Sequence, residues 1–427
     1  MKKKILILSI LMLMIAVFVI DSCKKSNPAP LNLGTLMVGT IDLNAAAAPT
    51  NVPVMPTITA TFSTDVDVAT ATVDNITLTE DYDVVSIPLT ITASGKVVTI
   101  MPTANLGNGA VYKLDITTGL KASDGQPLTA INRSFTTVGS FLPKGVFAYW
   151  NFDGNANDQT GNYNAATGGV TDVTYVTGRN ATSGQEASFN GTTSLIEIPN
   201  GDALDNTSDF SISFWMKDDT TGKVDQFVLG LAGWYGFQFE YNRQNDHRTD
   251  LLNKIGWCKL AVQYSLTGGT SANEDLLFPG SGTGNTKDNG GWQGWTFSKD
   301  LISNSGTGVN GLLAQQWAHV VCTYDHTTKI GTMYINSQEM KSQDFTLYPT
   351  THALYNATGL KFAGNAANNS LVFGFIQDKV SPTIPDSWAD YNDPANNHFK
   401  GLLDDVAIYH SVLTPALITL MYNSGKP

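Results

Sequence analysis

DFSISFWMK, residues 209–217, alternates apolar and small side chains without interruption. Phe210, Ile212 and Phe214 fall on one side of this run, and Ser211, Ser213 and Trp215 fall on the other. Because successive side chains of a strand point to opposite faces, the run predicts a β-strand with its phenylalanines in a core. Similar runs occur at residues 97–102, 110–116, 147–152, 316–325, 331–336 and 400–409.

One helix is predicted, at the end of the chain. Thr414 is suited to be its N-cap, Pro415 to be its first residue, and Gly425 to end it. The apolar stripe between these signals is Leu417, Ile418 and Met421.

The composition agrees with β-structure. Charged residues make up 15% of the 427-residue chain, against about 25% in a typical globular protein. This low value, together with 39 glycines, excludes a coiled coil or a helical repeat. The formal net charge is −12 and the sequence contains no basic stripe, which excludes nucleic acid as a partner.

The first residues predict export. Lys2, Lys3 and Lys4 precede an apolar run at 5–20 that is shorter than the roughly 20 residues of a membrane-spanning helix. We therefore predict a signal peptide at 1–22 and a tether at 23–32. The sequence before Cys23 resembles the lipobox of bacterial lipoproteins, although Asp21 departs from it. This resemblance implies lipidation of Cys23 and an outer-membrane lipoprotein that faces the cell surface or the periplasm. The alternative is an ordinary signal peptide cleaved near Ser22.

Residues 33–138 show short strands separated by turns. Residues 51–63, 112–128 and 134–137 resemble the corresponding segments of the bacterial Ig-like domain. The resemblance implies a β-sandwich that acts as a spacer and carries no catalytic residues.

Residues 145–427 resemble the laminin-G-like, concanavalin A-like jelly-roll family of bacterial surface proteins. The matching segments are residues 149–162, 187–199, 210–217, 316–325 and 401–414, in the family's order. Two stretches depart from the family and are predicted to be insertions, near 241–314 and 377–399. The expected fold class is all-β: an Ig-like β-sandwich followed by a concanavalin A-like jelly-roll β-sandwich with one short C-terminal helix.

The loop at 153–158 alternates Asp and Asn, whose oxygens suit Ca²⁺. The jelly-roll resemblance implies a structural calcium ion held by Asp153, Asp158 and Asp405, with Asn162 or backbone carbonyls completing the shell. The alternative is a polar turn and an exposed acidic pair.

Aromatic residues divide into two groups. Trp150, Trp215 and Trp317 fall on strands and are predicted to be structural. The others lie at strand ends or in the insertions, where their rings could stack on sugars. The ligand-binding candidates are Trp292, Trp295, Trp234, Tyr235, Trp388 and Tyr391. For Trp292 and Trp295, the alternative is that they pin a loop to the sandwich.

Known catalytic motifs are missing from the sequence. None of the six glutamates has the paired spacing of a laminarinase-like site, and the histidines show no metal-binding spacing. His319 is expected to be structural, and Cys258 and Cys322 to be free, buried thiols. We therefore predict a non-catalytic, lectin-like protein that binds a glycan or glycoconjugate. The alternatives are an adhesion protein with a protein partner, and a glycoside hydrolase.

Overall fold

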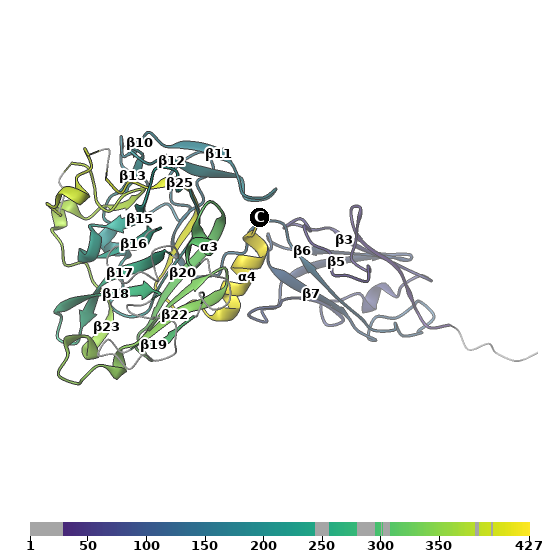
Figure 1. Ribbon diagram of the computed structural model, residues 1–427. Helices are drawn as coiled ribbons and strands as arrows, with labels where there is room; N and C mark the ends of the chain where they lie inside the picture. Colours follow the sequence, from purple (N-terminus) through teal and green to yellow (C-terminus); the bar gives the residue numbers. More distant parts are fainter. Residues whose placement is uncertain are drawn as a thin grey trace, which may run out of the picture. The chain divides into compact units, whose positions relative to one another are not determined.

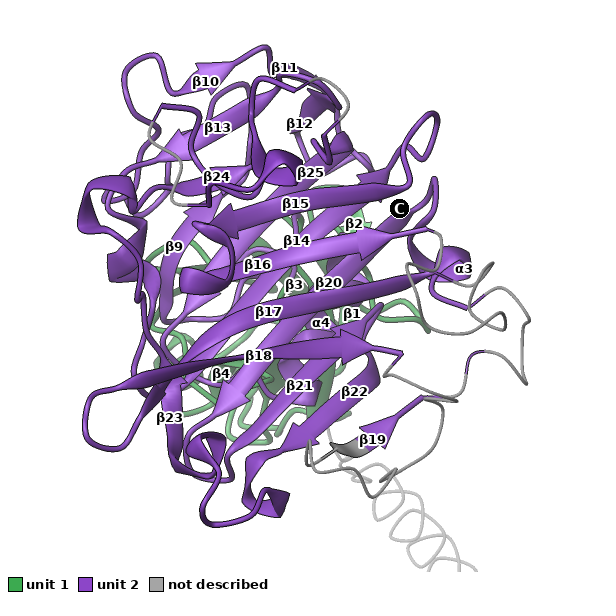
Figure 2. Ribbon diagram, turned by 60° about the vertical axis from the view of Figure 1, so that its left-hand side comes forward, with its two compact units in different colours: residues 1–106, 110–138 green, residues 107–109, 139–427 purple. Residues whose placement is uncertain are grey.

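The computed structural model describes residues 29–243, 256–279, 295–299, 301, 308–380, 384–393 and 396–427. The chain forms two compact units, residues 1–106 with 110–138 and residues 107–109 with 139–427 (Figure 2). Among the helices in the described ranges, none is long and apolar enough to cross a membrane.

The N-terminal unit contains two antiparallel sheets (Figure 1). The first has the order β2 (Ile41–Asp42), β1 (Leu33–Val38), β3 (Ile58–Phe62), β6 (Val97–Pro102) and β5 (Leu89–Ser94). The second has the order β4 (Ile76–Glu80), β7 (Val111–Ile116) and β8 (Ile131–Thr136). Ile58, Ala60 and Phe62 are buried and alternate with half-buried threonines, as the sequence predicts.

One sheet of the C-terminal unit, named sheet A here, has its strands side by side in Figure 2. Its order is β10 (Val170–Thr171), β13 (Leu195–Ile198), β24 (Leu371–Phe373), β15 (Asp225–Leu231), β16 (Phe237–Asn242), β17 (Trp257–Leu266) and β18 (Ser271–Phe278). A short strand, β23 (Ala357–Leu360), also pairs with β17.

The other sheet, named sheet B here, contains the strand quoted first. Its order is β11 (Thr174–Thr177), β12 (Gln185–Asn190), β25 (Lys400–Tyr409), β14 (Phe210–Asp218), β20 (Trp317–Asp325), β21 (Ile330–Ile335), β22 (Gln338–Asp344) and β19 (Trp295–Ser298). The strand nearest the end of the chain, β25, lies inside the sheet between β12 and β14, and it also pairs with β9 (Val146–Trp150).

Sheets A and B pack face to face around an aromatic core. Phe210 and Phe214 of β14 meet Phe237 and Phe239 of β16, with ring centroids 5.6 and 5.0 Å apart. Burying large apolar side chains of this kind is the main contribution to the stability of such a sandwich. The all-β fold class is confirmed, as is the hairpin of β20 and β21.

The C-terminal helix α4 (Pro415–Gly425) packs on the outer face of sheet B at Trp215. Thr414 caps this helix as predicted, because its side chain accepts a hydrogen bond from the Leu417 amide at 3.3 Å. Trp215 points away from the core, as its place in the alternation requires, yet it is only 3% exposed. The ring of Tyr422 from α4 stacks on it at 5.8 Å. A second helix, α3 (Asn310–Leu313), precedes β20.

Candidate functional site

Four of the six predicted ligand-binding residues lie together. Trp234 is 5.9 Å from Tyr235 and 5.7 Å from Trp388, measured between ring centroids. Tyr391 packs against the same small hydrophobic cluster as Trp234 and Tyr235. Its hydroxyl donates a hydrogen bond to the Thr193 carbonyl at 2.7 Å. We call Trp234, Tyr235, Trp388 and Tyr391 the aromatic cluster.

Two segments far apart in the sequence position the cluster. Trp234 and Tyr235 belong to a 3-10 turn, Gly233–Tyr235, directly after β15. Gly233 has φ +60°, a conformation that glycine adopts without strain. Trp388 and Tyr391 belong to the loop after β24. Gln377 holds this loop, because its side-chain amide donates to the carbonyls of Ile384 and Ala389, both at 2.9 Å.

The cluster is open to solvent. Trp388 is 38% exposed, while Trp234 and Tyr235 are half-buried. The inner edge of Trp388 contacts Phe227, whose ring centroid is 5.8 Å away. The cluster is therefore held in place by packing on Phe227, while part of its aromatic surface is exposed to solvent.

Polar side chains continue from the cluster across the outer face of sheet A. Gln238 and Glu240 of β16 point outward because Phe237, Phe239 and Tyr241 fill the core. The Gln238 amide donates to Glu240 at 3.2 Å. The Lys259 ammonium lies 3.4 Å from Glu240 and 3.2 Å from Asp275. We call Gln238, Glu240, Lys259 and Asp275 the polar row.

The aromatic cluster and the polar row adjoin each other. A methyl group added to Gly233, the residue before Trp234, would lie 3.0 Å from the Gln238 side-chain oxygen. That oxygen is buried and accepts no hydrogen bond within the described part of the chain. An aromatic surface beside hydrogen-bonding groups is the usual composition of a site for a polar small molecule.

Glu240 shares its surroundings with a second acid, Asp225. Burial, and then the charge of Asp225, raises the pKa of Glu240 to about 8. Burial also raises the pKa of Asp225, to about 6. Glu240 is therefore largely protonated at neutral pH and able to donate a hydrogen bond.

Asp158, which is predicted to bind calcium, forms hydrogen bonds within the protein. Its carboxylate accepts hydrogen bonds from the amides of Tyr149 at 2.8 Å and of Thr160, Asn162 and Tyr163 at 3.0 Å. Burial raises the pKa of Asp158, but these hydrogen bonds outweigh burial and bring the pKa below its ordinary value. Asp158 thus organises its loop through these hydrogen bonds.

Asp153 and Asp405 have other partners. Asp153 accepts from the Gln185 amide at 2.7 Å and from the Asn151 side chain at 2.7 Å. Asp405 pairs with Arg179 at 2.5 Å and also accepts from the Tyr149 hydroxyl. Across the residues that the structure describes, no group of three His, Cys, Asp or Glu side chains is placed to hold a metal ion. The three aspartates are not brought together, and calcium binding stays a prediction.

The remaining sequence predictions have mixed outcomes. Cys258 and Cys322 are free and buried, as predicted. Trp150 is fully buried, and His319 is a buried residue whose Nε2 lies 2.9 Å from the Ser213 hydroxyl. Cys23 and Trp292 lie outside the described residues. Trp295 begins β19, but its side chain also lies outside the description.

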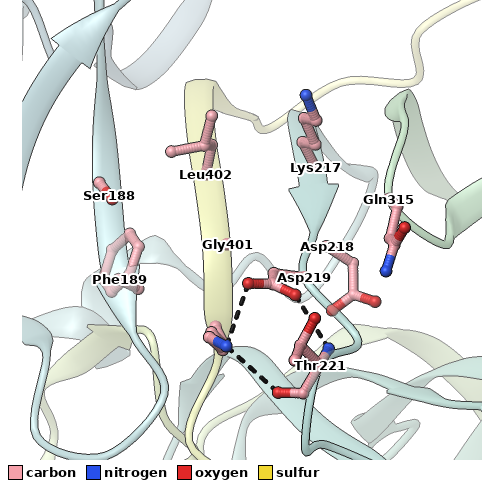
Figure 3. Close-up of a pocket in the computed structure, with 10 residues that line it drawn as sticks. Ser188, Phe189, Lys217, Asp218, Asp219, Thr221, Gln315, Gly401 and Leu402 are labelled. Atoms are coloured by element: carbon pink, nitrogen blue, oxygen red, sulfur yellow. Dashed lines mark hydrogen bonds and ion pairs between the residues drawn. The ribbon is translucent and has the colours of Figure 1, made fainter.

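An open groove on sheet B was missed by the sequence analysis (Figure 3). It has a volume of about 650 Å³ and is lined by Ser188, Phe189, Lys217, Asp218, Asp219, Thr221, Gln315, Lys400, Gly401 and Leu402. These residues come from three strands and two loops, and none belongs to a recognisable motif.

Comparison with known proteins identifies one part of the chain. Residues 40–137 match the family model described as a bacterial Ig-like domain. The Ig-like prediction is confirmed for this part. No curated protein matches the chain.

Solved structures resemble the chain only loosely. Domain 4 of AbnA, an extracellular arabinanase from Geobacillus stearothermophilus solved with arabinotriose, is 20% identical and has a TM-score of 0.34. The match covers 65% of this chain and 98% of that domain.

Two toxin domains are similarly distant. The ligand-binding domain of botulinum neurotoxin serotype D, solved with N-acetylneuraminic acid, is 14% identical over 65% of this chain and 50% of its own, with a TM-score of 0.38. The binding domain of Paraclostridial Mosquitocidal Protein 1 is 16% identical to this chain and has a TM-score of 0.39. That match covers 66% of this chain and 52% of the toxin domain. The chain thus spans about half the length of these toxin domains. Likenesses at this level do not assign a ligand.

Proposed function

We propose that the C-terminal unit binds a glycan, without catalysis, at the aromatic cluster and the adjoining polar row. The observation that carries this proposal is the meeting of Trp234 and Trp388, which come from distant segments and present an exposed aromatic surface. Sugar rings pack their C–H faces on such surfaces. The surface is small and ends at a polar row, which fits a sugar better than a broad apolar protein interface.

The polar row would contact the hydroxyl groups of the glycan. Asp275, whose side chain is 35% exposed, accepts hydrogen bonds, and Lys259 donates them. A sugar hydroxyl both donates and accepts, so it can satisfy either kind of group. The adjoining apolar and polar surfaces thus match the two faces of a sugar ring.

A glycan array probed with the purified protein tests the proposal. Trp388→Ala should weaken the observed binding several-fold, because a ring contact of this kind contributes about 1 kcal/mol. Trp388→Phe keeps a ring at the position and should retain most of the affinity. A protein that recognises no glycan, or a Trp388→Ala variant with unchanged affinity, would refute the proposal. Capture of a protein partner that Trp388→Ala abolishes would favour the adhesion alternative.

The cellular location of this activity is part of the proposal. We place the protein at the outer membrane through a lipid on Cys23, on the basis of residues 2–23 alone. Cys23→Ala should release the protein from the membrane fraction, and mass spectrometry of the wild type should detect the acyl chains.

A further inference from the structure

The groove of Figure 3 lies on the outer face of sheet B. Ser188, Leu402 and Lys217 sit side by side on β12, β25 and β14, because Leu402 pairs with both other residues. The loop after β14 and the residue before β20, Gln315, complete its walls. Its volume of about 650 Å³ falls within the range of small-molecule sites, roughly 300 to 1,000 Å³.

Lysines concentrate around this groove. Lys217 makes no hydrogen bond or ion pair with the described part of the chain and projects from β14 (Figure 3). The Lys400 ammonium lies 3.1 Å from Asp219 and donates to the Thr221 carbonyl at 3.2 Å. Burial lowers the pKa of Lys223, and the nearby charge of Lys400 lowers it further. In a chain with a net charge of −12, this is a local excess of positive charge.

The carboxylates of the groove do not neutralise Lys217. Asp219 is already paired with Lys400. Asp218 is 1% exposed and accepts a hydrogen bond from Gln226. Burial raises the pKa of Asp218 to about 7, so that it carries a full negative charge only above neutral pH. Glu186 of β12 is near enough for the charge of Lys217 to lower its pKa, but burial raises that pKa to about 7, so Glu186 compensates Lys217 only in part.

An aromatic ring adjoins this cation. Trp317 of β20 pairs directly with Lys217, and directly opposed residues project from the same face of a sheet. Trp317 is half-buried, so part of its indole remains accessible. Ser188 is also half-buried and lies three strands from Trp317 in the same row. A cation, an indole and a hydroxyl in one row fit a short glycan that carries a negative charge.

We propose that this groove is a second ligand site, which binds a glycan bearing an anionic group, either a carboxylate or a sulfate. Lys217 contacts the anionic group, and Trp317 packs on the sugar ring. The site is separate from the aromatic cluster and the polar row, and it does not depend on the function proposed for them.

Calorimetric titration of the purified protein tests this site. The probes are trigalacturonate, a sulfated galactose trimer and neutral galactotriose, each at about 50 mM and about 500 mM salt. An anionic trimer should bind, and its affinity should fall with salt because the Debye length shortens from roughly 14 to 4 Å. The trimer that binds identifies the group as carboxylate or sulfate. If neither anionic trimer binds, or if binding is independent of salt, the proposal is overturned.

Variants assign the binding to the groove. Lys217→Met should reduce the affinity for the anionic trimer about tenfold or more, because it removes a hydrogen bond to a charged group. Lys217→Arg should retain most of it. Lys96→Met, in the N-terminal unit, makes the same change of charge and should have no effect. Unchanged affinity in folded Lys217→Met would overturn the proposal. If that variant does not fold, Trp317→Ala replaces it and must lower the affinity several-fold.

Loss of one site does not imply loss of the other. Trp388→Ala, which tests the aromatic cluster, should leave binding of the anionic trimer unchanged. Failure of the glycan array together with salt-dependent, Lys217-dependent binding would refute the first proposal and support the second.

Discussion

The outer faces of sheets A and B carry similar residues and use them differently. On sheet B, Arg179 forms ion pairs with Asp404 and Asp405, and the Arg179 and Asp404 side chains are fully buried. On sheet A, Lys259 joins Glu240 to Asp275, whose side chain is 35% exposed. The Arg179 ion pairs of sheet B are enclosed by the protein, whereas the ion pair of sheet A remains in part accessible to a ligand. Ion pairs on a sheet thus indicate a binding face only where solvent still reaches them.

The largest effect is expected from a substitution that breaks the enclosed ion pairs of Arg179. Arg179→Met should lower the free energy of unfolding by about 3–5 kcal/mol, because it leaves buried carboxylates without their cation. Lys259→Met on sheet A should cost about 1 kcal/mol or less, because Glu240 is largely protonated and the ion pair with Asp275 is partly solvated. Urea unfolding of both variants measures the difference. Equal losses would mean that the two faces do not differ as described.

The next effect concerns Asp158, next to β9 of sheet B. Asp158→Ala should destabilise the protein by about 2–3 kcal/mol, because four amides lose their common acceptor. Thermal melting with and without a chelator separates this role from an ion. A melting temperature of the wild type that drops on chelation would support the calcium prediction. A loss below 0.5 kcal/mol (the level of an ordinary surface substitution) would contradict the role assigned to Asp158.

The third comparison concerns a pH dependence on sheet A, which is spread over several pH units. Since the folded protein holds the Glu240 proton up to about pH 8, it binds more protons than the unfolded chain above roughly pH 4.3. Stability should therefore decrease as pH rises through this window, by at most about 1.4 kcal/mol per pH unit. Glu240→Gln should flatten the dependence, whereas Glu339→Gln on the exposed surface of sheet B should not. Parallel pH profiles for wild type and Glu240→Gln would exclude this assignment.

The sequence predicts the strands well because their alternation is local. The runs at 209–217, 316–325 and 400–409 all became strands, and Thr414 and Pro415 opened the helix as expected. Alternation gives the direction of a side chain but not its exposure. Trp215 points outward and is nevertheless buried, since α4 packs over it.

The candidate sites were predicted only in part. Their places at a strand end and in an insertion singled out Trp234 and Trp388, but only the folded loop after β24 brings them together. The polar row depends on the register of β16, β17 and β18, which the sequence does not encode in any short motif. For the same reason the sequence does not show that Asp405 pairs with Arg179, which lies in a loop more than 200 residues earlier.

The position of β25 has a consequence for synthesis. This strand completes the middle of sheet B, where it pairs with β12 and β14, and with β9 at the start of the unit. Sheet B therefore cannot close until the residues up to Tyr409 have left the ribosome. Contacts between such distant segments form slowly, and until then β12 and β14 present unpaired edges that invite aggregation. A chain ending before Lys400 would keep those edges permanently, so we expect termination before β25 to yield an aggregating product.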